Sequence, residues 1–341
     1  MALNGTPAHT VKVQQHTDLW TTIKFYICGF LFNRYVSWGT RYLYSKYPDF
    51  WQPRAPTTIK HYAVRPNLEA RIFIPKSNNA NAKFPVFLLI HGGGWTMGDA
   101  RMDDEQAHLL ADKYGFCVAS IEYGLGPGNR FPVPIHDCLA HIKAVIADES
   151  LPLNLDKVIL GGFSAGGVMA LALAQLPDLK HVIKALVTFY PLTDWTGQDR
   201  PSPGVLPWGK PEELPKSLPL FQWTYVPAGQ DLCDPLLSPS FAKRDNLSQP
   251  LFMITAEGDF LYREAQLMAC RLAGAEGDSE ICNSESWEKN GVRYRRVRDM
   301  PHGFTHFFAK IPDPEWEAKR LKTNDDIWQE INEWAKRILK L

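Results

Sequence analysis

The sequence predicts an α/β fold in which a mostly parallel central sheet is flanked by helices. Residues 84–90, 157–160 and 250–255 are largely apolar runs without the alternation expected of a strand that has one solvated face. Such runs are typical of parallel strands that are buried on both faces. The run at 157–160 leads through glycines into residues 168–174, an apolar segment rich in helix formers. This strand, turn and helix are the first sign of the fold.

The turn after residues 157–160 carries the pattern Gly-x-Ser-x-Gly at positions 162–166. A serine between two glycines, placed between a strand and a helix, is typical of a nucleophile elbow. Glycine is needed because the turn is strained and two backbones approach closely. The turn holds the hydroxyl clear of the sheet, and the helix N-terminus favours developing negative charge. The sequence therefore predicts Ser164 as a nucleophile.

Three consecutive glycines, Gly92, Gly93 and Gly94, follow the strand predicted at residues 84–90. Such a run leaves backbone N–H groups free to point at a ligand. Together with the N–H of Ala165, the residue after the predicted nucleophile, they would bind the oxyanion of a tetrahedral intermediate. A flexible turn is the alternative interpretation.

A serine hydroxyl needs a base, and the base needs an orienting acid. Glu257 and Asp259 both follow the strand predicted at residues 250–255, on the edge where parallel sheets build their sites. We expect Asp259 to be the acid, because the glycine before it indicates a turn that presents the next side chain. Glu257 is the competing carboxylate.

A histidine for the base follows the strand predicted at residues 292–297. His302 lies between a proline and a glycine on a predicted loop, and we expect it to be the base. His306 comes a few residues later and is the alternative, although its place is more typical of a structural histidine.

In this order, the four elements resemble the hormone-sensitive-lipase-like esterase family of α/β-hydrolases. The resemblance is carried by the glycine run at 91–94, the serine motif at 162–167, the acid segment at 257–261 and the histidine segment at 302–304. Weaker matches at 190–194 and 234–239 extend it over roughly residues 56–341. The resemblance implies an α/β-hydrolase fold with a helical cap, a catalytic triad of Ser164, Asp259 and His302, and no cofactor or metal.

The chain departs from the family's pattern at two places. Residues 123–130 lack the Arg and Glu that usually follow the family's tyrosine, and Phe260 stands where proline is usual after the acid. The first departure concerns loop geometry near the site rather than the catalytic residues. A charged segment at about 278–290 separates the acid from the base and is expected to be a surface excursion.

Two segments are expected: an N-terminal cap segment at 1–55, and a hydrolase core at 56–341 with a cap insertion at about 195–245. The apolar segment 19–32 is shorter than the roughly 20 residues that span a bilayer. It also lacks the basic start and the cleavage site of a signal peptide. Because the resembled family uses its N-terminal segment in the cap, we expect a cap helix, with an interfacial helix that touches membrane or lipid as the alternative.

The insertion at about 195–245 is rich in proline and contains Trp195, Trp208 and Trp223. Long insertions in compact domains are often functional, and this one fits a lid. Its tryptophans would form a bulky apolar wall for an aromatic or polycyclic group. Plain packing inside the cap is an equally good interpretation. Apolar residues at helical spacing from Ile327 to Ile338 predict an amphipathic C-terminal helix that packs on the sheet.

Charge and cysteine content limit the partners and the compartment. Lys plus Arg and Asp plus Glu number 37 each, so no net charge favours nucleic acid or an anionic membrane. The six cysteines are scattered without metal-ligand spacing, which favours free thiols in a reducing compartment. The expected location is cytoplasmic, with peripheral association with an intracellular membrane as the alternative.

These features together predict a serine hydrolase that cleaves carboxylic esters of bulky apolar small molecules through an acyl-enzyme intermediate. The same acyl-enzyme would also serve an acyltransferase, a lactone or amide hydrolase, or a cyclase of specialised metabolism. A small-molecule receptor without catalysis is the less favoured alternative, because receptors on this scaffold lack the histidine that His302 supplies here.

Overall fold

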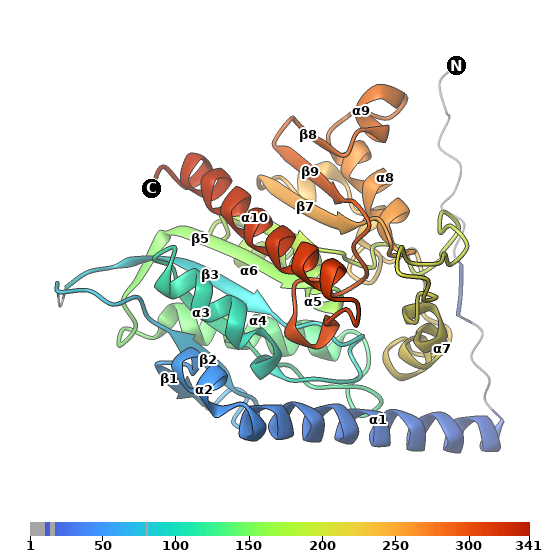
Figure 1. Ribbon diagram of the computed structural model, residues 1–341, viewed down its shortest axis with the longest axis horizontal. Coiled ribbons are helices and arrows are strands. Elements are labelled where there is room, and N and C mark those ends of the chain that lie inside the picture. Colours follow the sequence, from blue (N-terminus) through green and yellow to red (C-terminus); the bar gives the residue numbers. More distant parts are fainter. Residues whose placement is uncertain (1–10, 14–17, 80) are drawn as a thin grey trace.

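A nine-stranded sheet runs through the centre of the molecule (Figure 1). The computed structural model describes residues 11–13, 18–79 and 81–341, so residues 1–10 and 14–17 of the expected N-terminal cap segment lie outside the described residues. In sheet order the strands are β1 (Thr58–Lys60), β2 (Ala70–Phe73), β4 (Cys117–Ile121), β3 (Phe84–Ile90), β5 (Leu153–Phe163), β6 (Ala185–Phe189), β7 (Leu251–Ala256), β9 (Val292–Val297) and β8 (Ser286–Lys289).

The sheet is parallel from β4 to β9, and β1, β2 and β8 are antiparallel additions at its two edges. This confirms the predicted mostly parallel α/β architecture. The helices are α1 (Leu19–Lys46), α2 (Pro48–Trp51), α3 (Asp104–Asp112), α4 (Val133–Ala147), α5 (Ala165–Ala174), α6 (Pro177–Lys180), α7 (Leu214–Tyr225), α8 (Tyr262–Leu272), α9 (Ser279–Asn283) and α10 (Pro314–Leu339).

Helices cover both faces of the sheet, and this explains the unbroken apolar runs. Val86, Leu88 and Ile90 of β3 belong to the core that lies toward α4, α5 and α8. Phe87 and Leu89 belong to the core that lies toward α3 and α10. Since both sets are completely buried, no position of the strand needs a polar side chain. In Figure 1, α3 and α10 lie in front of the sheet, and α10 is the amphipathic C-terminal helix that the sequence predicts.

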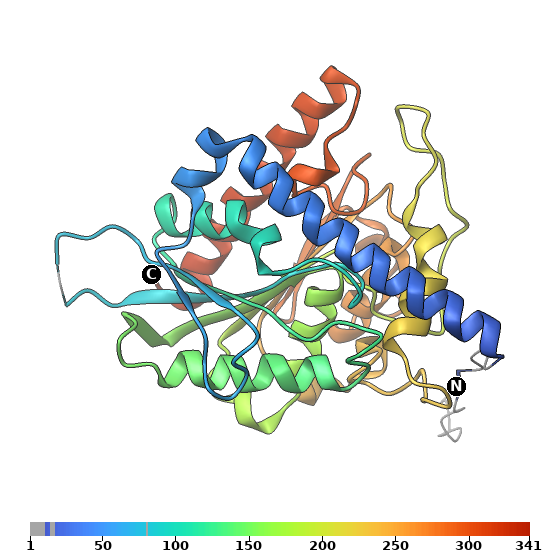
Figure 2. The same ribbon diagram turned by 90° about the horizontal axis from the view of Figure 1, so that it is seen from below.

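A long helix, α1, lies along one side of the molecule and packs against α7 of the insertion (Figures 1 and 2). The ring of Phe25 stacks on Trp223 at a centroid distance of 5.6 Å. Gly29 is the contact point, because a Cβ there would lie 2.9 Å from the Thr224 side chain. The N-terminal apolar segment and the tryptophan-bearing insertion therefore pack together. Among the described helices, none has both the length and the apolar character to cross a bilayer.

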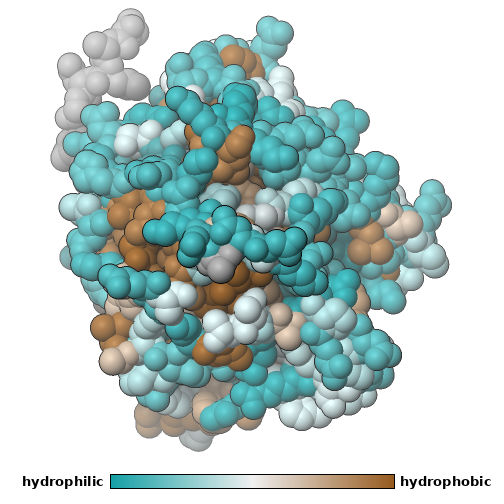
Figure 3. Space-filling view, turned by 90° about the vertical axis from the view of Figure 1, so that its left-hand side faces the viewer, coloured by the Kyte–Doolittle hydropathy of each residue, from teal (hydrophilic) through white to brown (hydrophobic). Residues whose placement is uncertain are grey.

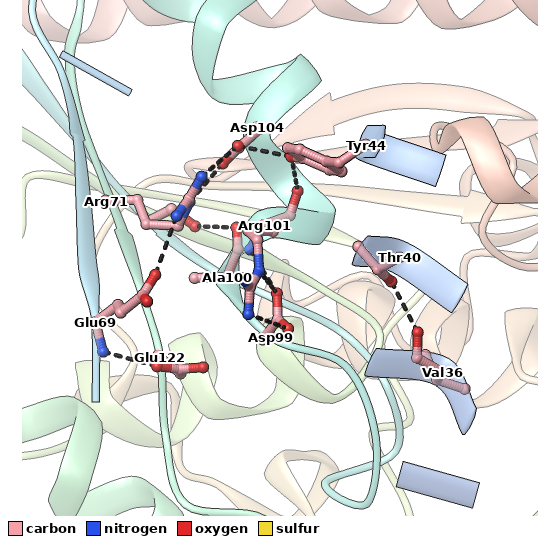
Figure 4. Close-up of polar contacts among 11 residues, drawn as sticks. Val36, Thr40, Tyr44, Glu69, Arg71, Asp99, Ala100, Arg101, Asp104 and Glu122 are labelled. Carbon is pink, nitrogen blue, oxygen red and sulfur yellow. Dashed lines mark hydrogen bonds and ion pairs between the residues drawn. The ribbon is translucent and has the colours of Figure 1, made fainter. Parts of the chain in front are cut away.

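The other end of α1 is joined to the hydrolase core by a buried polar cluster (Figure 4). The Tyr44 hydroxyl lies 2.6 Å from the Asp104 carboxylate and 2.8 Å from the carbonyl oxygen of Arg101. Arg71 of β2 donates two hydrogen bonds to the same carboxylate, at 2.8 and 2.6 Å. Burial raises the pKa of Tyr44 far above its usual range, so the hydroxyl stays a donor. These contacts fix where α1 leaves the core.

The cysteines differ from the expectation at one pair, because Cys270 of α8 and Cys282 of α9 form a disulfide with a Cα–Cα distance of 5.8 Å. The expected surface excursion at 278–290 folds back as α9 and the edge strand β8, and this brings Cys282 to α8. Cys117 and Cys138 are free and buried, as expected.

Replacing Tyr44 with Phe tests the polar cluster. The buried Asp104 carboxylate would lose a donor, and such a loss costs about 1.5–3 kcal/mol when the acceptor is charged. We expect Tyr44→Phe to lower the free energy of unfolding by that amount in urea titrations. Tyr35→Phe is the matched control, since Tyr35 is exposed on the same helix. Equal stability of the two variants would contradict the anchoring role.

Candidate active site

Ser164 occupies a sharp turn between β5 and α5, in the strained backbone conformation φ +51°, ψ −116°. The turn forms only because two neighbours have no side chain. A Cβ on Gly166 would lie 2.0 Å from the carbonyl oxygen of Ile90, and one on Gly162 would lie 2.5 Å from the Gly166 carbonyl carbon. The Ser164 N–H donates to the carbonyl oxygen of Phe189 in the next strand at 2.9 Å, which fixes the turn against the sheet.

His302 lies between Ser164 and Asp259. Its Nε2 is 2.9 Å from the Ser164 Oγ, and its Nδ1 is 2.6 Å from the Asp259 Oδ2. An ionised carboxylate can only accept hydrogen bonds, so Nδ1 carries the hydrogen and Nε2 accepts from the hydroxyl. Asp259 is buried and also accepts from the N–H of Leu261 at 2.9 Å. The ring of Tyr190 packs edge-on against the His302 ring at 4.8 Å.

Glu257 and His306, the alternatives for the acid and the base, make other contacts. Glu257 pairs with Arg296 at 3.6 Å, whereas Asp259 contacts His302. His306 is buried, with its Nε2 3.1 Å from Asp103 and its Nδ1 3.2 Å from the Tyr190 hydroxyl. The structure therefore brings Ser164, His302 and Asp259 together and leaves Glu257 and His306 outside this row of hydrogen bonds.

The glycine run follows β3 directly and lies against the serine. A Cβ on Gly92 would approach the Ser164 Cβ to 3.5 Å. Gly93 and Gly94 have φ angles of +111° and +57°, which residues with a side chain rarely adopt. Ala165 is the first residue of α5, so its N–H is one of those without a partner inside the helix. The three glycines and Ser164 line the same pocket, and Ala165 directly follows the serine.

Two aromatic rings hold the glycine run in place. The Nδ1 of His91 lies 2.7 Å from the Gly92 carbonyl oxygen, and the Tyr123 hydroxyl donates to the carbonyl oxygens of His91 and Gly92. The two rings stack at 4.2 Å. Burial lowers the pKa of His91, so the ring is neutral. Because the C=O and N–H of a trans peptide point in opposite directions, fixing the Gly92 carbonyl also fixes the N–H of Gly93.

A small pocket of about 80 Å³ opens beside Ser164 and the glycine run. Phe163, Tyr190, Phe221, Phe308 and Met97 are among its lining residues. A larger pocket of about 440 Å³ adjoins it, and Leu214, His302 and Phe308 line both. Small-molecule sites usually have about 300–1,000 Å³, so only the larger pocket has room for a drug-sized group.

The three tryptophans of the insertion do not form one common wall. Trp195 and Trp223 are buried in packing contacts, with Trp95 and Phe25 respectively. Trp208 lines the larger pocket. Of the three tryptophans, only Trp208 is placed to form part of a pocket wall, and plain cap packing describes the other two.

Glu212 is a site residue that the sequence does not reveal. It comes from the insertion, is only 5% exposed, and its two carboxyl oxygens accept from the N–H of Phe260 at 3.0 and 3.1 Å. Burial, the charge of Asp259 and a hydrogen bond between the two carboxyl groups raise the pKa of Glu212 to about 8. At neutral pH the Glu212 carboxyl therefore keeps its proton, next to Asp259. It lies in an irregular proline-rich segment, where no periodic pattern marks it.

No group of three or more His, Cys, Asp or Glu side chains in the described part of the chain could hold a metal ion. The arrangement fits a hydroxyl activated by an imidazole, next to backbone donors for negative charge.

Comparisons with known proteins point the same way. The sequence model of a family described as "alpha/beta hydrolase fold" matches residues 87–306, which is more than half of the chain. An arylacetamide deacetylase of Oryctolagus cuniculus is 29% identical over 46% of this chain and 42% of the relative. An ethyl acetate hydrolase of Pseudomonas putida is 28% identical over 61% of this chain and 66% of the relative.

A solved structure extends the likeness of fold to most of the chain. The crystal structure of a thermophilic carboxylesterase from a metagenomic library superposes with a TM-score of 0.67 at 21% identity, covering 92% of this chain and 97% of that one. The two sequence relatives are matched over two fifths and about two thirds of their own length.

Replacing Glu212 with Gln tests the carboxyl pair through stability. The pKa is raised from 4.5 to about 8 in the folded protein, so the protonated carboxyl contributes stability that is fully present below about pH 4.5 and is lost as pH rises through about 8. Gln keeps the shape and cannot ionise. We expect the melting temperature of the wild type to fall more steeply than that of Glu212→Gln between pH 5 and about 8.

The exposed neighbour Glu213, which pairs with Lys216, provides the control variant Glu213→Gln. Its melting curve should follow the wild type at every pH. Parallel pH dependences of the wild type and Glu212→Gln would show that Glu212 is already ionised in the folded protein.

Proposed function

Because this chain belongs to the hormone-sensitive-lipase-like esterase family of α/β-hydrolases, we propose that it is a serine hydrolase that cleaves carboxylic esters through an acyl-enzyme intermediate. The observation that carries the proposal is the row of hydrogen bonds from Asp259 through His302 to Ser164. Neither a binding protein nor a structural protein needs a hydroxyl held in a strained turn between an imidazole and backbone donors.

In the proposed mechanism, the Ser164 Oγ attacks the ester carbonyl carbon while His302 Nε2 takes the hydroxyl proton. Asp259 keeps the imidazole in the required tautomer and stabilises its positive charge. The N–H groups of the glycine run and of Ala165 bind the oxyanion, and one such donor is worth about 3–4 kcal/mol. His302 then gives the proton to the departing alcohol. A water molecule, deprotonated by His302, attacks the acyl-enzyme and releases the acid.

The two pockets support a substrate with a short acyl group and a larger apolar alcohol. The carbonyl oxygen must face the glycine run, so the acyl chain enters the pocket of about 80 Å³. The alcohol must leave toward His302, which lines both pockets, and only the pocket of about 440 Å³, also lined by Trp208 and Ile311, has room for a bulky group. The names of the two relatives describe removal of acetyl groups from arylacetamides and hydrolysis of ethyl acetate, and both involve a short acyl group. The bulky apolar part expected from the sequence is then the alcohol.

We also propose that α1 and the insertion at about 195–245 act as the cap over this site. Phe221 of α7 lines the small pocket, and it lies so near the glycine run that a Cβ on Gly94 would come within 2.6 Å of its ring. The cytoplasmic location remains a prediction. The buried thiols Cys117 and Cys138 favour a reducing compartment, whereas the Cys270–Cys282 disulfide favours an oxidising one.

Ser164→Ala tests the proposed nucleophile. Loss of a triad member removes about four to six orders of magnitude in kcat and leaves the binding contributions. We expect Ser164→Ala to lose hydrolysis of 4-nitrophenyl acetate and labelling by a phosphonate ester, measured by intact mass, at an unchanged melting temperature. The exposed Ser202 gives the control Ser202→Ala. Activity of Ser164→Ala within tenfold of the wild type would refute the assignment.

A series of 1-naphthyl esters from acetate to octanoate tests the two-pocket assignment. We expect kcat/KM to fall as the acyl chain outgrows the small pocket, and Met97→Ala to shift the preference toward longer chains by enlarging it. Trp208→Ala should lower kcat/KM for naphthyl acetate and leave ethyl acetate unaffected. A rise in kcat/KM from acetate to octanoate in the wild type would exchange the roles of the two pockets.

A further inference from the structure

The outer face of α1 carries large hydrophobic side chains that no part of the described chain covers. Of the 21 exposed large hydrophobic residues among the described positions, ten lie on this helix. They include Trp20, Tyr35 and Trp38, which are 81%, 70% and 63% exposed. A large exposed apolar patch on a protein surface marks an interaction site. By contrast, the side of the molecule in Figure 3 is mostly hydrophilic, with its hydrophobic residues in separate patches.

Seven of these ten side chains form one continuous stripe. They recur every three or four residues, so they lie along one side of the helix over its whole length. The stripe, which we call the outer face of α1, consists of Trp20, Ile23, Ile27, Leu31, Tyr35, Trp38 and Tyr42. In Figure 2, which views the molecule from below, α1 crosses in front of the other elements.

The opposite side of α1 contacts the rest of the protein and holds the helix in place. Phe25, Gly29 and Phe32 contact α7, and Tyr44 bonds to the core. The stripe is therefore not needed for the cap. Tyr, Trp and Phe exposed in such numbers would be costly in water, so a second contact must account for them.

The charges of α1 indicate which contact that is. Lys24, Arg34, Arg41 and Lys46 are exposed, and the 28 residues of the helix contain no Asp or Glu. The acidic residues next to it lie only beyond its ends, at Asp18 and Asp49. The chain as a whole has no net charge, so the positive charge of these side chains is a local feature of α1.

We propose that the outer face of α1 docks the protein on the surface of a bilayer that contains anionic phospholipids. Tryptophan and tyrosine favour the boundary between headgroups and acyl chains, and lysine and arginine favour the anionic surface. The helix lies flat rather than across the bilayer. At 1.5 Å per residue its footprint is roughly 42 Å long.

A second copy of the chain fits this face less well. Two such helices packed stripe against stripe would bring their exposed Lys and Arg side chains together with no carboxylate between them. An anionic lipid surface has the complementary charge, so the same residues strengthen that contact.

Docking in this orientation would have a consequence for the site, and this consequence rests on the proposed function. Phe32 of α1 packs on Phe221, and Phe221 lines the pocket beside Ser164. The bilayer would then be separated from the pocket by α1 and α7, and apolar esters dissolved in the membrane would be brought close to the cap.

Flotation with vesicles tests the docking. The full chain is mixed with vesicles of phosphatidylcholine alone or with phosphatidylserine added. We expect it to float with the phosphatidylserine vesicles at low salt, and binding to weaken as salt is raised. Replacing Trp20, Leu31 and Trp38 with Ser should reduce the bound fraction at least tenfold, as should replacing Lys24, Arg34 and Arg41 with Gln.

The matched control replaces three exposed apolar residues elsewhere, Val64, Leu155 and Val205, with Ser. It should float like the wild type, and all variants should keep the wild-type melting temperature. Ser164→Ala should also float normally, so loss of hydrolysis and loss of docking are distinguished. Wild type that stays in solution with both vesicles would overturn the proposal, and so would a dimer in light scattering that the Ser variant of the stripe abolishes.

Discussion

The close contact between the first turn of α5 and the end of β3 determines how the rest of the site is built. Gly166 lies so near the Ile90 carbonyl that no side chain fits between them. This approach sets Ser164 in its strained turn and, because the glycine run begins two residues after Ile90, also places Gly92 against the serine. One backbone contact therefore positions the proposed nucleophile and the start of the glycine run together.

The proposed cap, formed by α1 and the insertion, contacts three parts of the core. Phe221 of α7 rests on Gly94, Glu212 of the insertion accepts from the N–H of Phe260, and Tyr44 of α1 bonds to Asp104. The first two contacts reach the glycine run and the residue that follows Asp259. Of the three contacts, only that of Phe221 borders the pocket beside Ser164, and it narrows the space over the glycine run.

The sequence predicts those parts of the site that lie next to strand ends. Ser164, the glycine run and Asp259 each follow an apolar run, so local pattern and chain order suffice to place them. Glu212 is different, because its contact with Phe260 joins residues 48 positions apart and its own segment has no period. Cys282 reaches Cys270 only after α9 folds back. Pocket volume depends on how side chains pack, which neither composition nor spacing specifies.

α1 shows most clearly where sequence pattern is insufficient. A helix with apolar residues on one side predicts a single partner, whereas α1 is apolar on nearly all sides and contains only basic charges. From the sequence, a cap helix and an interfacial helix are therefore competing interpretations of residues 19–32. In the structure the inner side contacts α7 and the outer side remains exposed, so packing on the insertion leaves the outer side free for the docking that we propose. We therefore expect the helix to have two partners, because it has two apolar faces.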